Sequence, residues 1–146
     1  MSYLDLNVHC VFATKEREPF ILESWRNRLH EFLGGCARET GCIPKRIGGV
    51  SDHVHMLLAM KGTHAISEVM REVKTVSSRW IHAELGERDF AWQEGFAAFS
   101  VSASRVPVVA AYIDRQEEHH RKLSSKEELK QLLLRHGVVY DPRYFA

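Results

Sequence analysis

The stretch Ser51-Asp52-His53-Val54-His55-Met56-Leu57-Leu58 contains an apolar run typical of a buried strand, with two histidines two residues apart. Side chains alternate between the two faces of a strand, so His53 and His55 are predicted to share one face and Val54 and Met56 the other. Two imidazoles on one face could hold a divalent metal ion and leave positions for further ligands. Two histidines do not by themselves define a metal site, so surface or hydrogen-bonded core histidines are an equal alternative.

The totals indicate one ordinary globular domain spanning residues 1–146, with 45% hydrophobic residues. No apolar run approaches the ~20 residues that span a bilayer. The first residues lack a basic segment followed by an apolar one, so no signal peptide and a cytoplasmic location are expected. The cysteines, at positions 10, 36 and 42, are odd in number and lack a CxxC spacing, which predicts buried free thiols. The formal net charge is only +1, so any contacts with nucleic acid must come from local clusters of basic residues.

Hydrophobic periodicity on either side of the two histidines predicts the order strand, helix, strand, strand, helix, strand, then helices. The predicted strands cover 4–13, 42–50, 53–58 and 97–102, and the predicted helices cover 24–40, 64–85, 106–121 and 126–136. This order is typical of an α+β fold, the ferredoxin-like split βαβ antiparallel sheet, followed by a helical addition.

Three local predictions refine this outline. In the first strand, Leu4, Leu6, Val8, Cys10 and Phe12 are expected to face the core, whereas His9 is expected on a half-exposed face. A hairpin turn is expected near Ser51-Asp52. The Gly48-Gly49 pair before it indicates either a bulge or the close approach of another backbone or a ligand, and the sequence does not distinguish them.

A second polar group lies far along the chain, in the predicted helix 106–121. Tyr112, Gln116 and His119 are spaced to form one stripe on this helix, and His120 lies close to it. A tyrosine becomes a useful nucleophile when a metal polarises the phosphate that it attacks. The amide oxygen of Gln116 could complete a metal shell begun by His53 and His55. Considered alone, the helix is better explained by Tyr112 as a core or surface aromatic and Gln116 as an exposed side chain without a metal.

The sequence resembles the single-tyrosine HUH transposases, which include small bacterial insertion-sequence enzymes and domesticated relatives that act at repetitive extragenic palindromes. The resemblance rests on four segments in the family's order, which together extend over most of the chain: His9-Cys10-Val11-Phe12-Ala13-Thr14-Lys15, Asp52-His53-Val54-His55-Met56-Leu57, Trp92-Gln93-Glu94-Gly95-Phe96-Ala97-Ala98-Phe99-Ser100-Val101-Ser102 and Tyr112-Ile113-Asp114-Arg115-Gln116-Glu117-Glu118-His119-His120.

The resemblance implies roles for four residues. His53, His55 and Gln116 would be ligands of Mg²⁺ or Mn²⁺, and Tyr112, on a C-terminal catalytic helix, would be the nucleophile. The enzyme would cleave single-stranded DNA near a hairpin, keep the 5′ end as a phosphotyrosine, and rejoin it to a second end. The resemblance also implies a homodimer, in which the tyrosine helix of one chain can complete the histidine site of the other.

Six basic residues are predicted to contact the DNA backbone, because they lie in loops or on a charged helix stripe that includes Lys74 and Arg79. They are Lys15, Arg17, Lys45, Arg46, Lys74 and Arg79. No role is predicted for His119 and His120 beyond phosphate binding or packing.

Two alternatives belong to other classes. A nucleotide hydrolase with a His-x-His-x-His run would need a histidine at position 57, where the chain has leucine. A catalytically idle or domesticated, sequence-specific DNA-binding relative has no chemical need to retain His53, His55, Tyr112 and Gln116 together. The DNA strand transferase is therefore the favoured function.

Overall fold

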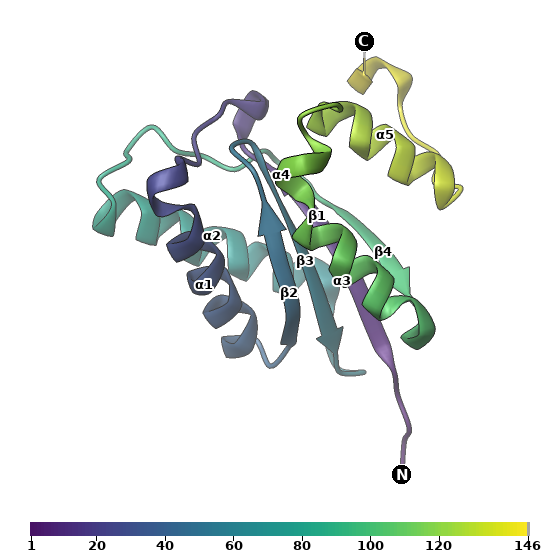
Figure 1. The fold of residues 1–146 in the computed structure, drawn as a ribbon. Coiled ribbons are helices and arrows are strands. Elements are labelled where there is room, and N and C mark those ends of the chain that lie inside the picture. The colour runs from purple at the N-terminus through teal and green to yellow at the C-terminus, as the bar shows by residue number, and fades with distance from the viewer. Residues whose placement is uncertain (146) are drawn as a thin grey trace.

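The two predicted histidines lie on a central strand of the sheet. In the computed structural model, which describes residues 1–145, β2 (Ile43–Gly49) and β3 (His53–Met60) form the expected hairpin. β3 also pairs with β1 (Leu6–Ala13), and β1 pairs with β4 (Ala97–Val101), so that the antiparallel order is β2-β3-β1-β4. This order, shown in Figure 1, confirms the predicted ferredoxin-like sheet.

One face of the sheet is covered by α1 (Glu23–Glu39) and α2 (Ile66–Glu84). In α1, Trp25, Leu29 and Leu33 recur at helical spacing and are buried against the sheet. They pack with Phe12 and Met56, which the alternation of the strands directs to this face. This is the larger of the hydrophobic cores in the described chain, and it fixes the strand that carries both histidines.

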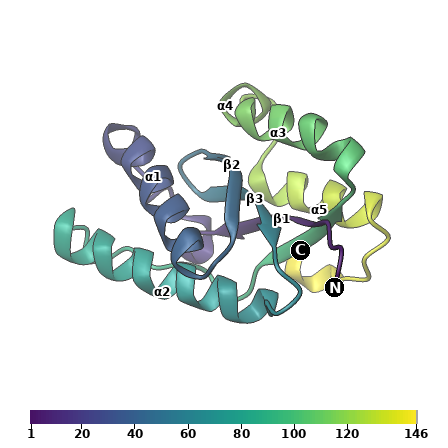
Figure 2. The same ribbon diagram turned by 90° about the horizontal axis from the view of Figure 1, so that it is seen from below.

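Helices also cover the opposite face, which explains why the half-exposed position predicted for His9 is wrong. Figure 2 shows α3 (Val106–Asp114) and α5 (Ser125–Arg135) on the side of the sheet away from α1 and α2. Small apolar clusters join α3 to Leu57 and α5 to Phe99. His9 is consequently 3% exposed. The strand also begins at Leu6 instead of Leu4, and both of these leucines are exposed instead of core-facing.

The predicted continuous helix 106–121 is interrupted. α3 ends at Asp114, Arg115 leaves the helical region at φ −99° and ψ 20°, and α4 (Gln116–His119) follows as a single turn. The change of direction places Gln116 against the sheet, where its side chain is 2% exposed. The last helix, α5, begins one residue earlier than predicted, where Ser124 Oγ accepts a hydrogen bond from the Glu127 N–H.

Gly48 is the point where α3 meets the sheet. A Cβ added at Gly48 would lie 2.6 Å from the carbonyl oxygen of Ile113, closer than atoms can pack. The close-approach alternative for Gly48-Gly49 is therefore correct, and the irregularity in the β2–β3 register lies earlier, between Pro44 and Arg46.

Two smaller predictions can be compared directly. The three cysteines are free and buried, as expected. Within the described residues, the helices are too short or too polar to cross a bilayer. Three short 3-10 turns complete the chain: Lys15–Arg17, Ala103–Arg105 and Pro142–Phe145.

Candidate active site

His53 and His55 project from β3 toward the face covered by α3 to α5, and both are almost fully buried. Each ring is held by a hydrogen bond at Nδ1. His53 Nδ1 lies 2.8 Å from Asp52 Oδ1, and His55 Nδ1 lies 2.7 Å from His9 Nε2. Such bonds at one ring nitrogen orient a histidine for ligation through the other. The two Nε2 atoms therefore point into a common site.

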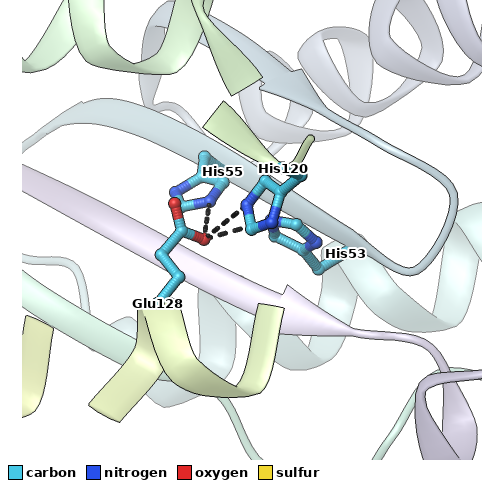
Figure 3. Close-up of side chains that lie close together, drawn as sticks. All are labelled: His53, His55, His120 and Glu128. Atoms are coloured by element: carbon cyan, nitrogen blue, oxygen red, sulfur yellow. Dashed lines mark hydrogen bonds and ion pairs between the residues drawn. The ribbon is translucent and has the colours of Figure 1, made fainter. Parts of the chain in front are cut away.

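The centre of this site is the carboxylate of Glu128, on α5 (Figure 3). Its Oε1 lies 2.9 Å from His55 Nε2, 3.2 Å from His53 Nε2 and 3.1 Å from His120 Nε2. The side chain is 1% exposed. A buried carboxylate is stable only when charges or hydrogen bonds compensate its desolvation, and here the imidazoles do so.

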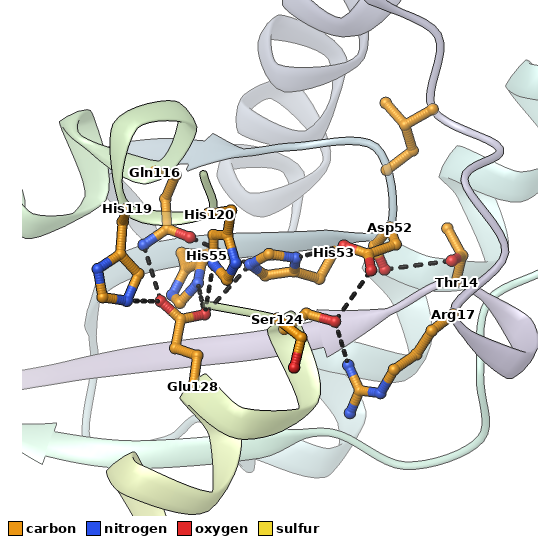
Figure 4. A network of polar contacts seen from close by, with 12 residues as sticks. Thr14, Arg17, Asp52, His53, His55, Gln116, His119, His120, Ser124 and Glu128 are labelled. Atoms are coloured by element: carbon orange, nitrogen blue, oxygen red, sulfur yellow. Dashed lines mark hydrogen bonds and ion pairs between the residues drawn. The ribbon is translucent and has the colours of Figure 1, made fainter. Parts of the chain in front are cut away.

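The second oxygen of Glu128 meets the residues of the Tyr112 segment. Tyr112 Oη donates a hydrogen bond to Glu128 Oε2, and Gln116 Nε2 donates another at 3.1 Å. The Oε1 of Gln116 lies 3.1 Å from His53 Nε2. His119 Nε2 is 3.3 Å from Glu128 Oε2 and 3.4 Å from the tyrosine oxygen. Figure 4 shows most of these groups converging on the one carboxylate, and all of them belong to one chain.

The donor set fits a divalent cation. His53, His55, His120 and Glu128 each offer a ligand atom, and these atoms lie within 4.8 Å of one another. His120 Nε2 is buried and lies 3.1 Å from Glu128 Oε1, and among residues 1–145 this ion-pair contact is its polar partner. Its Nδ1 is bonded to the Leu123 carbonyl, which leaves the Nε2 lone pair directed into the cluster.

The electrostatics of the two central histidines differ. Burial lowers the pKa of His53, but hydrogen bonds to Asp52 and Glu128 outweigh burial and raise that pKa to about 9. Burial lowers the pKa of His55 to about 4. Burial alone would raise the pKa of Glu128, but its histidine contacts hold that pKa far below the usual range. Without a metal, the cluster is thus a carboxylate paired mainly with protonated His53.

The phenol of Tyr112 holds its proton more tightly here than an exposed tyrosine does. Burial and its contact with the Glu128 anion raise the pKa of Tyr112 well above the ordinary value. Free phenolate at this position would face an adjacent negative charge. As long as Glu128 is ionised, the phenol therefore keeps its proton.

The predicted DNA-binding residues occupy three different places. Arg17 donates to Ser125 Oγ at 3.0 Å, and this hydroxyl donates to Asp52, so Arg17 lies in the outer layer of the site. Lys15 is exposed beside it. Lys74 and Arg79 lie on α2, on the other face of the sheet, and Lys74 donates to two backbone carbonyls.

The remaining two residues, Lys45 and Arg46, are exposed on the edge strand β2. Arg46 forms an ion pair with Asp114 of α3 at 3.4 Å. The structure thus brings His53, His55, Tyr112 and Gln116 together, but it does not gather the six basic residues into one surface.

Sequence reasoning missed Glu128 and the inward position of His9. Glu128 lies on a charged helix with no motif around it, in the sequence Ser-Lys-Glu-Glu-Leu, so nothing local distinguishes it from Glu127. The burial of His9 could have been suspected, because the neighbouring residues Val8, Cys10 and Val11 are apolar.

Comparisons with known proteins agree on the kind of protein. The family model described as "Transposase IS200 like" matches residues 2–116, which include His53, His55, Tyr112 and Gln116. A candidate transposase from Deinococcus radiodurans R1 is similar in structure, with a TM-score of 0.66 and 21% identity over 79% of this chain and 93% of that chain.

A REP-associated tyrosine transposase bound to a REP hairpin has a TM-score of 0.63 and 15% identity, over 82% of this chain and 72% of that chain. At these identities the two structures show the shared fold. No curated protein matches the chain in sequence. The family match extends over most of the chain, and the fold agrees with it. The chain belongs to the family of IS200-like transposases.

Proposed function

We propose that this transposase cleaves and rejoins single-stranded DNA at hairpin-flanked ends, through a 5′-phosphotyrosine on Tyr112. The observation that carries the proposal is the position of the Tyr112 hydroxyl. It touches the same carboxylate that joins His53 and His55, so the nucleophile and the metal ligands meet at one point. One structural neighbour was solved with a REP hairpin, which supports DNA of this shape as substrate.

The phosphotyrosine linkage would keep the free energy of the broken phosphodiester bond, so the strands can be rejoined without an added energy source. The Tyr112 oxygen forms a bond to phosphorus, and the bond from phosphorus to the 3′ oxygen breaks. The phenol proton passes to a neighbouring base, and the departing 3′ oxygen takes up a proton. Glu128 Oε2 accepts the phenol's hydrogen bond, but its lowered pKa makes it a weak base, so His119 Nε2, 3.4 Å from the tyrosine oxygen, is the better acceptor for the proton. A second 3′-OH then reverses the first step and joins a new strand.

His53, His55 and Gln116 would hold Mg²⁺ or Mn²⁺, with His120 and Glu128 available to complete the shell. A divalent cation there would polarise the phosphate and stabilise the charge that develops on its oxygens. Asp52 and His9 keep the two imidazoles oriented for this ligation.

The test is incubation with a divalent metal and labelled single-stranded DNA that carries the hairpins flanking the gene. A protein–DNA adduct that survives denaturing electrophoresis is expected from the wild type and from Tyr3→Phe, an exposed control. Tyr112→Phe should give none while still binding the hairpin. Tight hairpin binding by a wild type that forms no adduct would instead support the idle DNA-binding alternative.

The predicted homodimer and cytoplasmic location remain predictions. Every group of the site comes from one chain, so shared sites would require α3 to α5 to exchange between two copies.

A further inference from the structure

A second feature at Tyr112 is a cavity on the side of the tyrosine away from β2. It has a volume of about 500 Å³ and lies between the start of α3, the end of α5 and strand β4. Tyr112 and His9 are among the residues that line it. The cavity therefore adjoins the residue proposed as the nucleophile.

The lining of the cavity is basic. Arg105 precedes α3 and Arg135 ends α5, and both side chains are exposed. Within the described part of the chain, neither guanidinium forms an ion pair with a carboxylate. Two cations without acidic partners at one opening attract an anion, and planar guanidinium groups suit phosphate oxygens in particular.

The other walls suit a nucleoside. The ring of His136 is stacked on Phe99, with ring centroids 4.4 Å apart, and lines the cavity while remaining exposed. Such a ring offers a flat surface for a base. Ser100 and Ser102 add exposed hydroxyls from β4 and the residue after it, and Val108 and Val109 of α3 add apolar surface.

We propose that this cavity seats the nucleotide next to the phosphate that Tyr112 attacks, with Arg105 and Arg135 on its backbone phosphates and His136 against its base. The inference rests on the proposed function, because it takes Tyr112 as the point of attack. It adds a site that none of the six predicted DNA-binding residues belongs to. It also explains why a chain with net charge +1 can hold a single strand at its nucleophile.

A smaller cavity on the other side of Tyr112 is less suited to this role. It has a volume of about 370 Å³ and is lined by Arg115 and Lys122, but also by the acidic Glu118. The carboxylate there would oppose a phosphate, whereas the lining of the larger cavity contains no acidic residue.

The experiment compares Arg105→Ala/Arg135→Ala with Arg71→Ala/Arg88→Ala, which removes two exposed arginines from α2 and the loop after it. Binding of a short, hairpin-free single strand is measured by fluorescence anisotropy from low to moderate salt. The plot of log K against log salt should become less steep by about 1.4 in the first variant, since each phosphate contact on a single strand contributes ~0.7 to the size of the negative slope. The control variant should keep the wild-type slope.

Adduct formation on the full hairpin substrate is measured in parallel. The first variant should slow the adduct by tenfold or more, and His136→Ala should weaken strand binding without changing the salt slope. An unchanged slope in the first variant would overturn the proposed nucleotide site, whether or not the wild type forms an adduct. A less steep slope together with no adduct from the wild type would support the nucleotide site and contradict the proposed cleavage through a phosphotyrosine.

Discussion

Glu128 is the residue on which the site depends most, because a single carboxylate contacts four imidazoles, an amide and a phenol. Such a group is costly to remove when its partners stay buried. Its neighbour Glu127 is exposed and offers a matched control on the same helix.

Glu128→Gln should weaken Mn²⁺ binding by about 10–100-fold, the range typical of groups that support or complete a metal shell. Glu127→Gln should leave binding unchanged. Titration calorimetry with MnCl₂ and the metal-free protein measures both. Equal affinity in the two variants would show that Glu128 is not part of the metal centre.

The histidines predict how stability depends on pH when no metal is bound. The pKa of His9 is lowered to about 3, first by burial and then by His55; burial lowers the pKa values of His55 and His30 to about 4. Unfolding lets these rings bind protons below their ordinary pKa of 6.5, so stability is lost as the pH falls from 6.5 toward 4. The slope approaches ~1.4 kcal/mol per pH unit for each proton.

His53 acts in the opposite direction. Its folded pKa is raised to about 9, so its contribution is complete below 6.5 and is lost as the pH rises through 9. The melting temperature in EDTA should therefore be highest near pH 6.5 and fall on both sides. His53→Gln should flatten the alkaline side only. A melting temperature that rises steadily to pH 9 would contradict this assignment.

At the scale of elements, the contact between β2 and α3 places the tyrosine. Gly48→Ala would force its Cβ against the Ile113 carbonyl, next to Tyr112. We expect a loss of about 1–3 kcal/mol in unfolding free energy, as for overpacked cores, and a loss of adduct larger than stability accounts for.

Gly35→Ala is the control for this change. A Cβ at Gly35, in the middle of α1, would meet nothing within 4 Å, so alanine should stabilise the helix by ~0.5–1 kcal/mol. Urea unfolding and the adduct assay compare the two variants. Full adduct formation by Gly48→Ala would show that the fit of α3 on β2 does not control Tyr112.

The sequence predicted the elements whose periodicity is long and regular. α1, α2 and the β2–β3 hairpin lie within a few residues of their predicted bounds, because each buries a repeating apolar face. The break at Arg115 was not predictable, since no proline or glycine marks it and tertiary packing of Gln116 decides it.

The same distinction applies to the site. His53 and His55 were visible because two residues on one strand must share a face, and the family resemblance supplied Tyr112 and Gln116. Glu128 was not visible, because its position depends on how α5 returns across the sheet, which spacing along the chain does not specify. The family match also ends at residue 116, before α5 begins.

For the whole molecule, assembly of the site within one chain predicts the outcome of a mixing experiment. His55→Ala keeps the proposed nucleophile but loses a proposed ligand, and Tyr112→Phe keeps the proposed ligands but loses the proposed nucleophile. A mixture of the two should remain inactive if each chain uses its own tyrosine. Cleavage restored to about a quarter of the wild-type level would show that copies exchange their tyrosine helices, as the predicted shared homodimer requires, because half of the dimers would be mixed and each would have one complete site of two.

The proposed phosphotyrosine intermediate is tested most directly by mass spectrometry of the adduct after nuclease and protease digestion. We expect that one peptide carries the nucleotide mass, that fragmentation places this mass on Tyr112, and that the released strand ends in a free 3′-OH. Nucleotide attached to any other residue, or cleavage that leaves a 5′ phosphate free in solution and no modified peptide, would contradict it.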